Sequence, residues 1–246
     1  MPRGELQICR DAEAVTQAVV DLFLNVGETA IEDRGSFSVA LSGGNTPRAA
    51  YTLLGQEPNR SALSWADVHV YFGDERCVPP DDEQSNYRMA DKTFLQSVAI
   101  PQANVHRMRG EIDPAEAAAE YAQTLRTNLG DRPRFDLILL GLGLDGHTAS
   151  LFPGTPPDTD NDKLVRAVYA ESPGMWRITM TPKVLNAGRV VAFALEGTEK
   201  AAIFCAVYED PVDPLKYPAQ IVNPTDGRLL WIADDSACGI IEKDLS

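Results

Sequence analysis

Two hydrophobic patterns alternate along the chain. Apolar residues at helical spacing over 11–31 predict a long amphipathic helix, whereas short and nearly continuous apolar runs predict strands. The predicted strands are 37–41, 68–72, 135–140, 190–195 and 229–233, with a further short strand beginning at Arg177. The other predicted helices are 47–54, 86–98, 114–129 and 198–208.

Regular alternation of strands and helices predicts a mostly parallel, Rossmann-like α/β sheet with helices on both faces, which makes three layers. The run FDLILL at 135–140 is nearly all apolar, as expected for a strand that is covered on both faces. The proline-rich segments 153–163 and 210–224 are too short to be convincing interdomain linkers. We therefore expect one domain over residues 1–246.

The charge balance narrows the choice of partners. The chain has 22 Lys and Arg against 36 Asp and Glu, for a formal net charge of −14. We therefore expect no nucleic-acid partner and no membrane partner, because both are anionic. If the ligand is a small anion, a few Lys and Arg must gather locally to overcome the overall field.

Cysteine and histidine usage argues against a metal site. The four Cys form no C-x-x-C pair and there are only three His, so zinc-site spacing is absent. Residues 1–10 lack the apolar core of a secretory signal. The longest apolar stretch, 135–144, is about half the ~20 residues of a membrane span. We expect a cytoplasmic protein without a zinc site.

Four segments that carry candidate functional residues follow predicted strands. The carboxyl ends of parallel strands share one edge of a sheet. The first is SGGNTP at 42–47. Glycines at Gly43 and Gly44 allow close backbone approach, and the hydroxyls of Ser42 and Thr46 suit a phosphate. The alternative is a plain turn, with Asn45 in the turn, Thr46 as N-cap and Pro47 in the first helical position. The P-loop lysine is missing.

The second and third segments are GDER at 73–76 and GLGLDGHTAS at 141–150. Asp74 and Arg76 in the former are equally explained by a solvated turn. The latter contains G-x-G-x-x-G, but prolines arrive too early for the long helix of a dinucleotide site. What remains is a glycine turn that presents Asp145 and His147. A histidine is the natural base near neutral pH, although a lone His is more often structural.

The fourth set is Arg177 and Lys200. Each is also explained as a surface charge. A cation in the first turn of a helix gains nothing from the helix dipole, which mildly favours a ligand-related reason for Lys200. Ser150 lacks the G-x-S-x-G elbow of serine hydrolases, so a serine nucleophile has little support.

Five motifs in order resemble the 6-phosphogluconolactonase family, within the larger group that includes glucosamine-6-phosphate deaminases. They are LSGGNTP, YFGDERCVPPDDEQSNYRM, GLGLDGHTASLFPG, RITMTPKVLN and EGTEKA, and together they span most of the chain. The resemblance implies a Rossmann-like fold, no metal and no cofactor. It also implies hydrolysis of 6-phospho-D-glucono-1,5-lactone to 6-phosphogluconate in the oxidative pentose phosphate pathway, so the expected partner is a small sugar-phosphate lactone.

The resemblance also implies site residues. His147 matches the family's general base, and the matching phosphate- and substrate-binding positions are Ser42, Gly43, Gly44, Arg76, Arg177 and Lys200. A lactone is an activated ester, so an activated water and oxyanion stabilisation suffice. Asp74 or Asp145 would orient the imidazole or a sugar hydroxyl. Arg76 and amides of the 141–146 turn are candidate oxyanion donors.

Two other functions compete. An amino-sugar-phosphate deaminase/isomerase would carry Asn-Glu-Pro after its histidine, where this chain has Leu151, Phe152 and Pro153. A non-enzymatic sugar-phosphate sensor would keep Lys200 and the glycine loop but would not need His147. The presence of His147 counts against a sensor. The deaminase/isomerase also has an aromatic residue where this chain has Arg76, and its two departures from this sequence favour the lactonase. We expect a monomer or a weak homo-oligomer.

Overall fold

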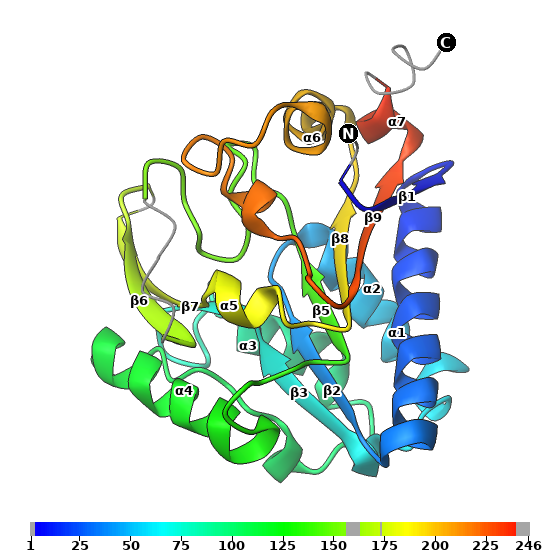
Figure 1. Ribbon diagram of the computed structural model, residues 1–246. Helices are drawn as coiled ribbons and strands as arrows, with labels where there is room; N and C mark the ends of the chain where they lie inside the picture. Colours follow the sequence, from blue (N-terminus) through cyan, green and yellow to red (C-terminus); the bar gives the residue numbers. More distant parts are fainter. Residues whose placement is uncertain (1–2, 156–162, 173, 240–246) are drawn as a thin grey trace.

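The computed structural model describes residues 3–155, 163–172 and 174–239. Its main sheet has six strands in the order β1-β9-β8-β5-β2-β3, and every neighbouring pair is parallel. The strands are β1 (Glu5–Cys9), β2 (Phe37–Leu41), β3 (Val68–Phe72), β5 (Leu137–Leu140), β8 (Val190–Leu195) and β9 (Arg228–Asp234). The predicted parallel α/β fold is confirmed (Figure 1).

A second, antiparallel sheet lies beside the first. Its order is β4-β7-β6, with β4 (Asp74–Arg76), β7 (Met175–Met180) and β6 (Val165–Ala170). Only β7 was expected, as the short strand at Arg177. The edge strands β1, β4 and β6 were missed because they are short or mixed in polarity, so their pairing depends on a neighbour rather than on a local pattern.

The helices follow the predicted pattern with shifted ends. They are α1 (Ala12–Arg34), α2 (Asn45–Leu54), α3 (Asn86–Ala90), α4 (Pro114–Leu129), α5 (Pro182–Leu185), α6 (Ala201–Glu209) and α7 (Asp235–Cys238). The predicted cap of α4 is confirmed, since Asp113 accepts from the amides of Ala115 and Glu116. The predicted helix at 86–98 divides into α3 and a π-helical turn, Asp91–Leu95.

Thr46 is not the N-cap of α2. The helix begins at Asn45, and its N-cap is Gly44, which has a φ of 110° and no side chain to form a cap. Lys200 lies in a 3₁₀ turn, Thr198–Lys200, directly before α6. Most of the predicted loop 153–163 lies outside the described residues.

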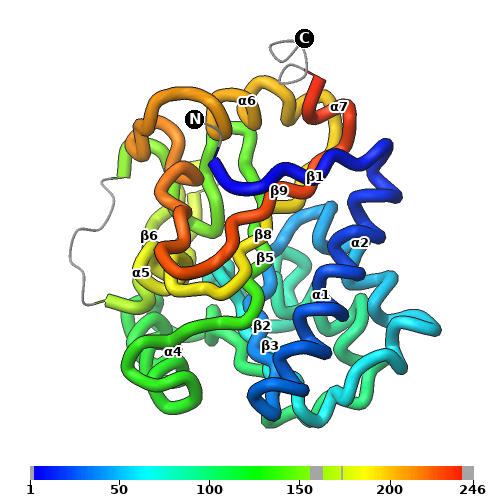
Figure 2. Tube along the Cα trace, turned by 45° about the vertical axis from the view of Figure 1, so that its right-hand side comes forward, coloured from blue at the N-terminus to red at the C-terminus, as the bar shows by residue number. Residues whose placement is uncertain are grey.

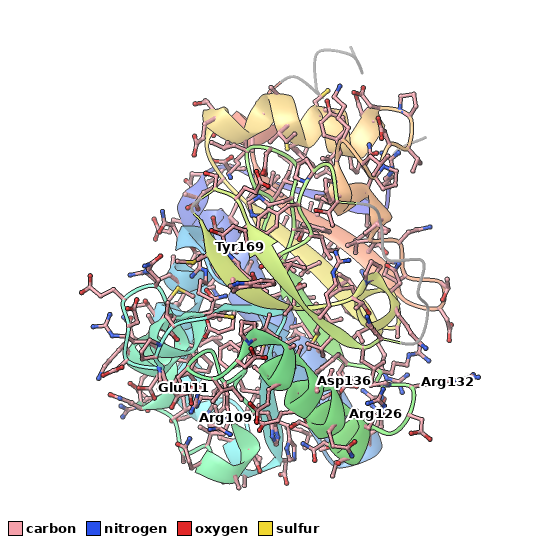
Figure 3. All side chains as sticks on the ribbon, turned by 90° about the vertical axis from the view of Figure 1, so that its left-hand side faces the viewer. Arg109, Glu111, Arg126, Arg132, Asp136 and Tyr169 are labelled. Carbon is pink, nitrogen blue, oxygen red and sulfur yellow. The ribbon has the colours of Figure 1, made fainter. Side chains whose placement is uncertain are left out.

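The main sheet is buried on both faces, as its apolar strands require. One face packs against α1 and α2, which lie side by side (Figure 2), and α3 also belongs to this core. The other core joins α4 and α6 to the second sheet through residues such as Ile138, Phe193 and Ile178. Tyr169 lies exposed on the outer side of the second sheet (Figure 3). Among the described residues, helices long and apolar enough to cross a membrane are absent.

Candidate active site

The predicted segments converge on one cavity of about 320 Å³ at the carboxyl ends of β2, β5 and β8. All the predicted site residues line it except Asp145, which contacts His147. The lining residues among them are Ser42, Gly43, Gly44, Asn45, Thr46, Asp74, Arg76, His147, Arg177 and Lys200. The parallel sheet brings the loops after β2, β5 and β8 together because its strands end at the same edge, and the antiparallel pair of β4 and β7 adds Asp74, Arg76 and Arg177.

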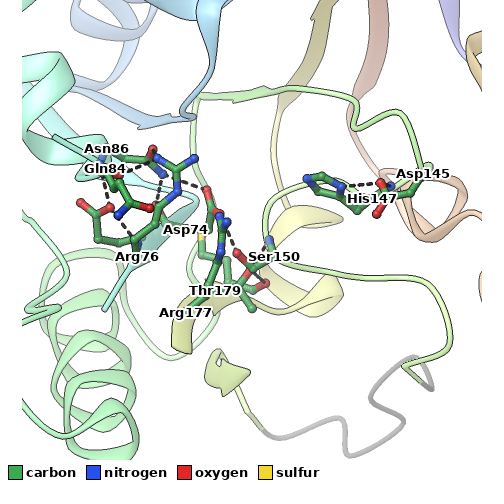
Figure 4. A network of polar contacts seen from close by, with 11 residues as sticks. Asp74, Arg76, Gln84, Asn86, Asp145, His147, Ser150, Arg177 and Thr179 are labelled. Carbon is green, nitrogen blue, oxygen red and sulfur yellow. Dashed lines mark hydrogen bonds and ion pairs between the residues drawn. The ribbon is translucent and has the colours of Figure 1, made fainter. Parts of the chain in front are cut away.

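His147 and Asp145 form a hydrogen-bonded pair in the loop after β5. The ring Nδ1 lies 2.5 Å from Asp145 Oδ1, and the His147 amide donates to the same oxygen at 3.1 Å. Burial acts to raise the pKa of Asp145, but the hydrogen bond and charge of His147 hold it below its usual value. A carboxylate only accepts, so Nδ1 carries the hydrogen and Nε2 is left as an acceptor. Figure 4 shows Asp145 on one side of the imidazole ring and the group around Asp74 on the other.

The loop is shaped to admit this imidazole. A Cβ on Gly143 would lie 2.1 Å from His147 Nδ1, so only glycine leaves room for the ring. The Gly143 amide donates to His147 O at 2.8 Å, and the Gly146 amide donates to Gly143 O at 3.0 Å. These two amides, expected as oxyanion donors, are therefore engaged within the loop. Ala149 has a φ of 48°, a left-handed conformation that costs energy and is often found at functional sites.

Arg76 and Arg177 are directly opposite residues of the antiparallel β4–β7 pair. Like charges in this position repel, and the nearby carboxylate of Asp74 offsets part of this repulsion. Burial first, and then the charge of Arg76, lower the pKa of Arg177. The Nε atoms of both side chains are buried and lack a hydrogen-bond partner within the described part of the chain. Two such guanidinium groups suit a ligand with several acceptor oxygens.

Asp74 is buried beside this pair and is held by hydrogen bonds. Ser150 Oγ donates to its Oδ2 at 2.7 Å, Asn86 Nδ2 lies 3.2 Å from its Oδ1, and Arg177 Nη1 lies 3.9 Å from Oδ2. The acid that contacts the imidazole is thus Asp145, while Asp74 belongs to the group around the arginines (Figure 4).

The glycine loop forms another wall of the cavity. Ser42 Oγ is buried and has no hydrogen-bond partner within the described residues, although such groups are usually satisfied. Gly43 has no room for a side chain, because a Cβ would lie 2.1 Å from Asn86 Oδ1. The uncapped N-terminus of α2 follows this loop, and helix N-terminal amides favour anions. The loop therefore offers donors for a negatively charged group.

Lys200 and two acids complete the cavity. Lys200 Nζ donates to Leu142 O at 2.7 Å. Burial lowers the pKa of Lys200, although the charges of Glu199 and Asp145 act to raise it. Glu196 and Glu199 also line the cavity, and burial raises the pKa of Glu196. Neither acid was predicted, nor was Asn86. All three lie inside matched motifs, but a motif does not show which of its side chains face the cavity.

Within the described ranges, no group of three or more His, Cys, Asp and Glu side chains is placed to hold a metal ion. The charged and polar side chains of the cavity thus combine a carboxylate-supported imidazole with three cations. Such a site can bind an anion and take a proton from a water molecule beside it.

Comparison with known proteins identifies the family of the chain. The family described as glucosamine-6-phosphate isomerases/6-phosphogluconolactonase matches residues 10–231. A 6-phosphogluconolactonase from Synechocystis sp. is 43% identical over 85% of this chain and 86% of its own length. One from Nostoc sp. is 37% identical over 94% of this chain and 96% of its own length. The solved 6-phosphogluconolactonase from Trypanosoma cruzi has a TM-score of 0.86 at 26% identity, covering 96% of each chain. The chain therefore belongs to the glucosamine-6-phosphate isomerase/6-phosphogluconolactonase family.

Proposed function

We propose that this protein hydrolyses 6-phospho-D-glucono-1,5-lactone to 6-phosphogluconate, the second step of the oxidative pentose phosphate pathway. The name 6-phosphogluconolactonase, carried by relatives that match most of the chain, supports this reaction. The observation that carries it is that one cavity holds both a carboxylate-bound imidazole and a pair of opposed arginines. The first supplies a base for ester hydrolysis, and the second supplies a site for the phosphate.

His147 is the proposed general base. Its Nε2 takes a proton from water as the water oxygen attacks the lactone carbonyl carbon. The resulting oxyanion collapses, the bond from this carbon to the ring oxygen breaks, and the imidazolium returns a proton to that oxygen. Asp145 holds the ring by Nδ1 and stabilises its positive charge while it is protonated.

The phosphate is proposed to lie among the cations and the glycine loop. Arg76 and Arg177 offer forked donors, and Lys200 adds a compact charge. Ser42 Oγ and the α2 N-terminus supply neutral donors. Arg76 is a candidate both for the phosphate and for the oxyanion, and its position opposite Arg177 supports the role on the phosphate.

The wider expectations are also proposals. The core shared by both sheets supports a single domain over residues 1–246. We further propose a cytoplasmic protein that works as a monomer or a weak homo-oligomer, without a metal or an organic cofactor.

The deciding experiment follows proton release from freshly made phosphorylated lactone, with the spontaneous rate subtracted. We expect acceleration by the purified protein in the presence of EDTA. Loss of activity with EDTA and recovery with a divalent ion would contradict the metal-free reaction. Ammonia release from glucosamine 6-phosphate would instead indicate the deaminase, and tight binding without turnover of either compound would indicate a sensor.

A further inference from the structure

Asn86 joins three segments of the candidate site, although the proposed reaction gives it no part. It is the first residue of α3, it is 2% exposed, and it lines the cavity. Its Oδ1 accepts from Arg76 Nη1 at 2.6 Å. Its Nδ2 donates to the backbone oxygen of Asp74 at 2.9 Å and lies 3.2 Å from Asp74 Oδ1 (Figure 4).

The chemistry of the neighbours determines how this amide is oriented. A guanidinium only donates, so it must meet Oδ1; a carbonyl and a carboxylate only accept, so they must meet Nδ2. The side chain of Asn86 therefore needs an acceptor and a donor at the same time. An aspartate of the same shape would supply two acceptors, and an alanine would supply neither.

The position of Asn86 is itself tightly held. The buried carboxylate of Glu75 accepts hydrogen bonds from the backbone N–H of Asn86 at 2.7 Å, from the backbone N–H of Tyr87 at 2.8 Å and from Ser85 Oγ at 3.0 Å. On its other side, the side-chain carboxamide of Asn86 leaves no space for a Cβ on Gly43. The carboxamide is thus fixed between β4 and the glycine loop. A small displacement of the carboxamide would also displace the Arg76 guanidinium that is hydrogen-bonded to it.

We propose that Asn86 is a positioning residue, which aims the Arg76 guanidinium at the substrate phosphate and so sets the preference for a phosphorylated lactone. With Nη1 held by Asn86 Oδ1 and by Gln84 O at 2.7 Å, the plane of the guanidinium is fixed. Arg76 lines the cavity, so the part of the guanidinium that is not engaged by Asn86 and Gln84 is left for a ligand. Pre-ordering of this kind lowers the entropic cost of binding. The inference rests on the proposed function.

The test uses Asn86→Ala and Asn86→Asp, with Asn104→Asp as a matched control. Asn104 is half-buried, lies outside the cavity lining and donates from Nδ2 to Ala66 O, so the control adds the same charge away from the cavity. Values of kcat and KM are measured for the phosphorylated lactone and for glucono-1,5-lactone. Affinity for 6-phosphogluconate is measured by calorimetry, which does not depend on turnover.

We expect Asn86→Ala to raise KM for the phosphorylated lactone about 10-fold, as for one lost contact to a charged group, with a smaller change in kcat. Affinity for 6-phosphogluconate should fall by a similar factor, and kcat/KM for the unphosphorylated lactone should stay within about twofold of wild type. Asn86→Asp should lose more at pH 8 but regain activity relative to wild type as the pH falls toward 5. The reason is that protonation removes the introduced charge, which lies beside Asp74.

The outcomes separate the two proposals. A wild-type protein that does not accelerate hydrolysis of the phosphorylated lactone contradicts the proposed function. An active wild type with equal losses on both lactones, or with none in Asn86→Ala, contradicts the role of Asn86. Thermal unfolding checks that each variant is folded; if Asn86→Ala is not, the near-isosteric Asn86→Asp decides, and a flat ratio to wild type across pH overturns the inference.

Discussion

Arg76 and Arg177 face each other across two antiparallel strands, and the buried Nε of each lacks a hydrogen-bond partner among the described residues. The chain has a net charge of −14, but these two cations lie side by side and repel each other. A bound phosphate would offset that repulsion. The pairing of Arg76 with Arg177 therefore favours ligand binding but does not stabilise the ligand-free protein.

Arg177→Met should therefore weaken use of the phosphorylated lactone without weakening the fold. We expect kcat/KM for this substrate to fall about 10- to 100-fold, since one charge-assisted contact is lost. The melting temperature should change little, because the methionine keeps the apolar stem, and relief of the repulsion by Arg76 offsets loss of the 3.9 Å ion pair with Asp74. Steady-state kinetics and thermal unfolding provide the two measurements.

Lys200→Ala serves as the parallel variant, with the same expected loss. Wild type should use glucono-1,5-lactone poorly, and neither substitution should change that low activity much, because the phosphate contact is never made. Equal losses on both lactones would show that the two cations act on the ring or are structural.

His147→Ala should lower kcat by about 10²- to 10⁴-fold, the usual contribution of a positioned general base. Asp145→Ala should cost about 10- to 100-fold, less than a buried orienting carboxylate, because the Asp145 side chain is 51% exposed and water can partly replace it. Stopped assays of proton release measure both. His69→Gln is the control, and near-normal kcat in His147→Ala would remove the histidine from the reaction.

Gly143→Ala tests the geometry of the same pair without touching either side chain. The new Cβ would lie 2.1 Å from His147 Nδ1 and 2.7 Å from Asp145 Oδ1, so the imidazole must move. We expect a loss of kcat of about 10²-fold or more, because a displacement of about 1 Å can cost that much. Gly73→Ala is the matched control, since its Cβ would meet nothing closer than 3.6 Å. Equal activity in the two variants would contradict the proposed position of the base.

His106 predicts how stability depends on pH. Burial, and then the charge of His69, lower the pKa of His106 to about 4, and its ring stacks on Tyr71 with centroids 4.4 Å apart. In the unfolded chain a histidine titrates near 6.5. Its stabilising contribution is therefore complete above about pH 6.5 and is lost progressively as the pH falls toward 4.

Urea unfolding at pH 7 and pH 4.5 measures this effect. We expect the free energy of unfolding of wild type to fall more than that of His106→Gln, with a difference on the order of 1 kcal/mol. An equal fall in the two proteins would show that the acid sensitivity lies elsewhere. His69→Gln should show part of the same change, because burial also lowers the pKa of His69.

Several features were readable from local pattern. The strands at 37–41 and 68–72 and the helix at 114–129 were predicted where they lie, because continuous apolar runs and a capped amphipathic helix carry their own signals. The motifs at strand ends also indicated one shared cavity, because parallel strands end at one edge. Nearly all the predicted site residues line that cavity.

Other features were decided by tertiary contacts. The prediction of Thr46 as the N-cap was wrong, because the N-cap is Gly44, two residues earlier. Gly44 has no side chain, so the N-terminal amides of α2 stay uncapped beside the cavity. Asp74 and Asp145 could not be ranked as partners of His147, since both are acids near strand ends. The fold turns Asp145 onto the imidazole and holds Asp74 with Ser150 and Asn86.

The sequence by itself thus determined the layered α/β fold, the family and most of the predicted side chains that line the cavity, because hydrophobic periodicity and motifs are local properties of the chain. Only the tertiary structure decided how those side chains pair. Arg76 opposes Arg177 through the register of β4 and β7, two strands about a hundred residues apart in the chain. Register is set by hydrogen bonds between distant segments and by the packing of a shared core, and neither leaves a pattern in the neighbouring residues.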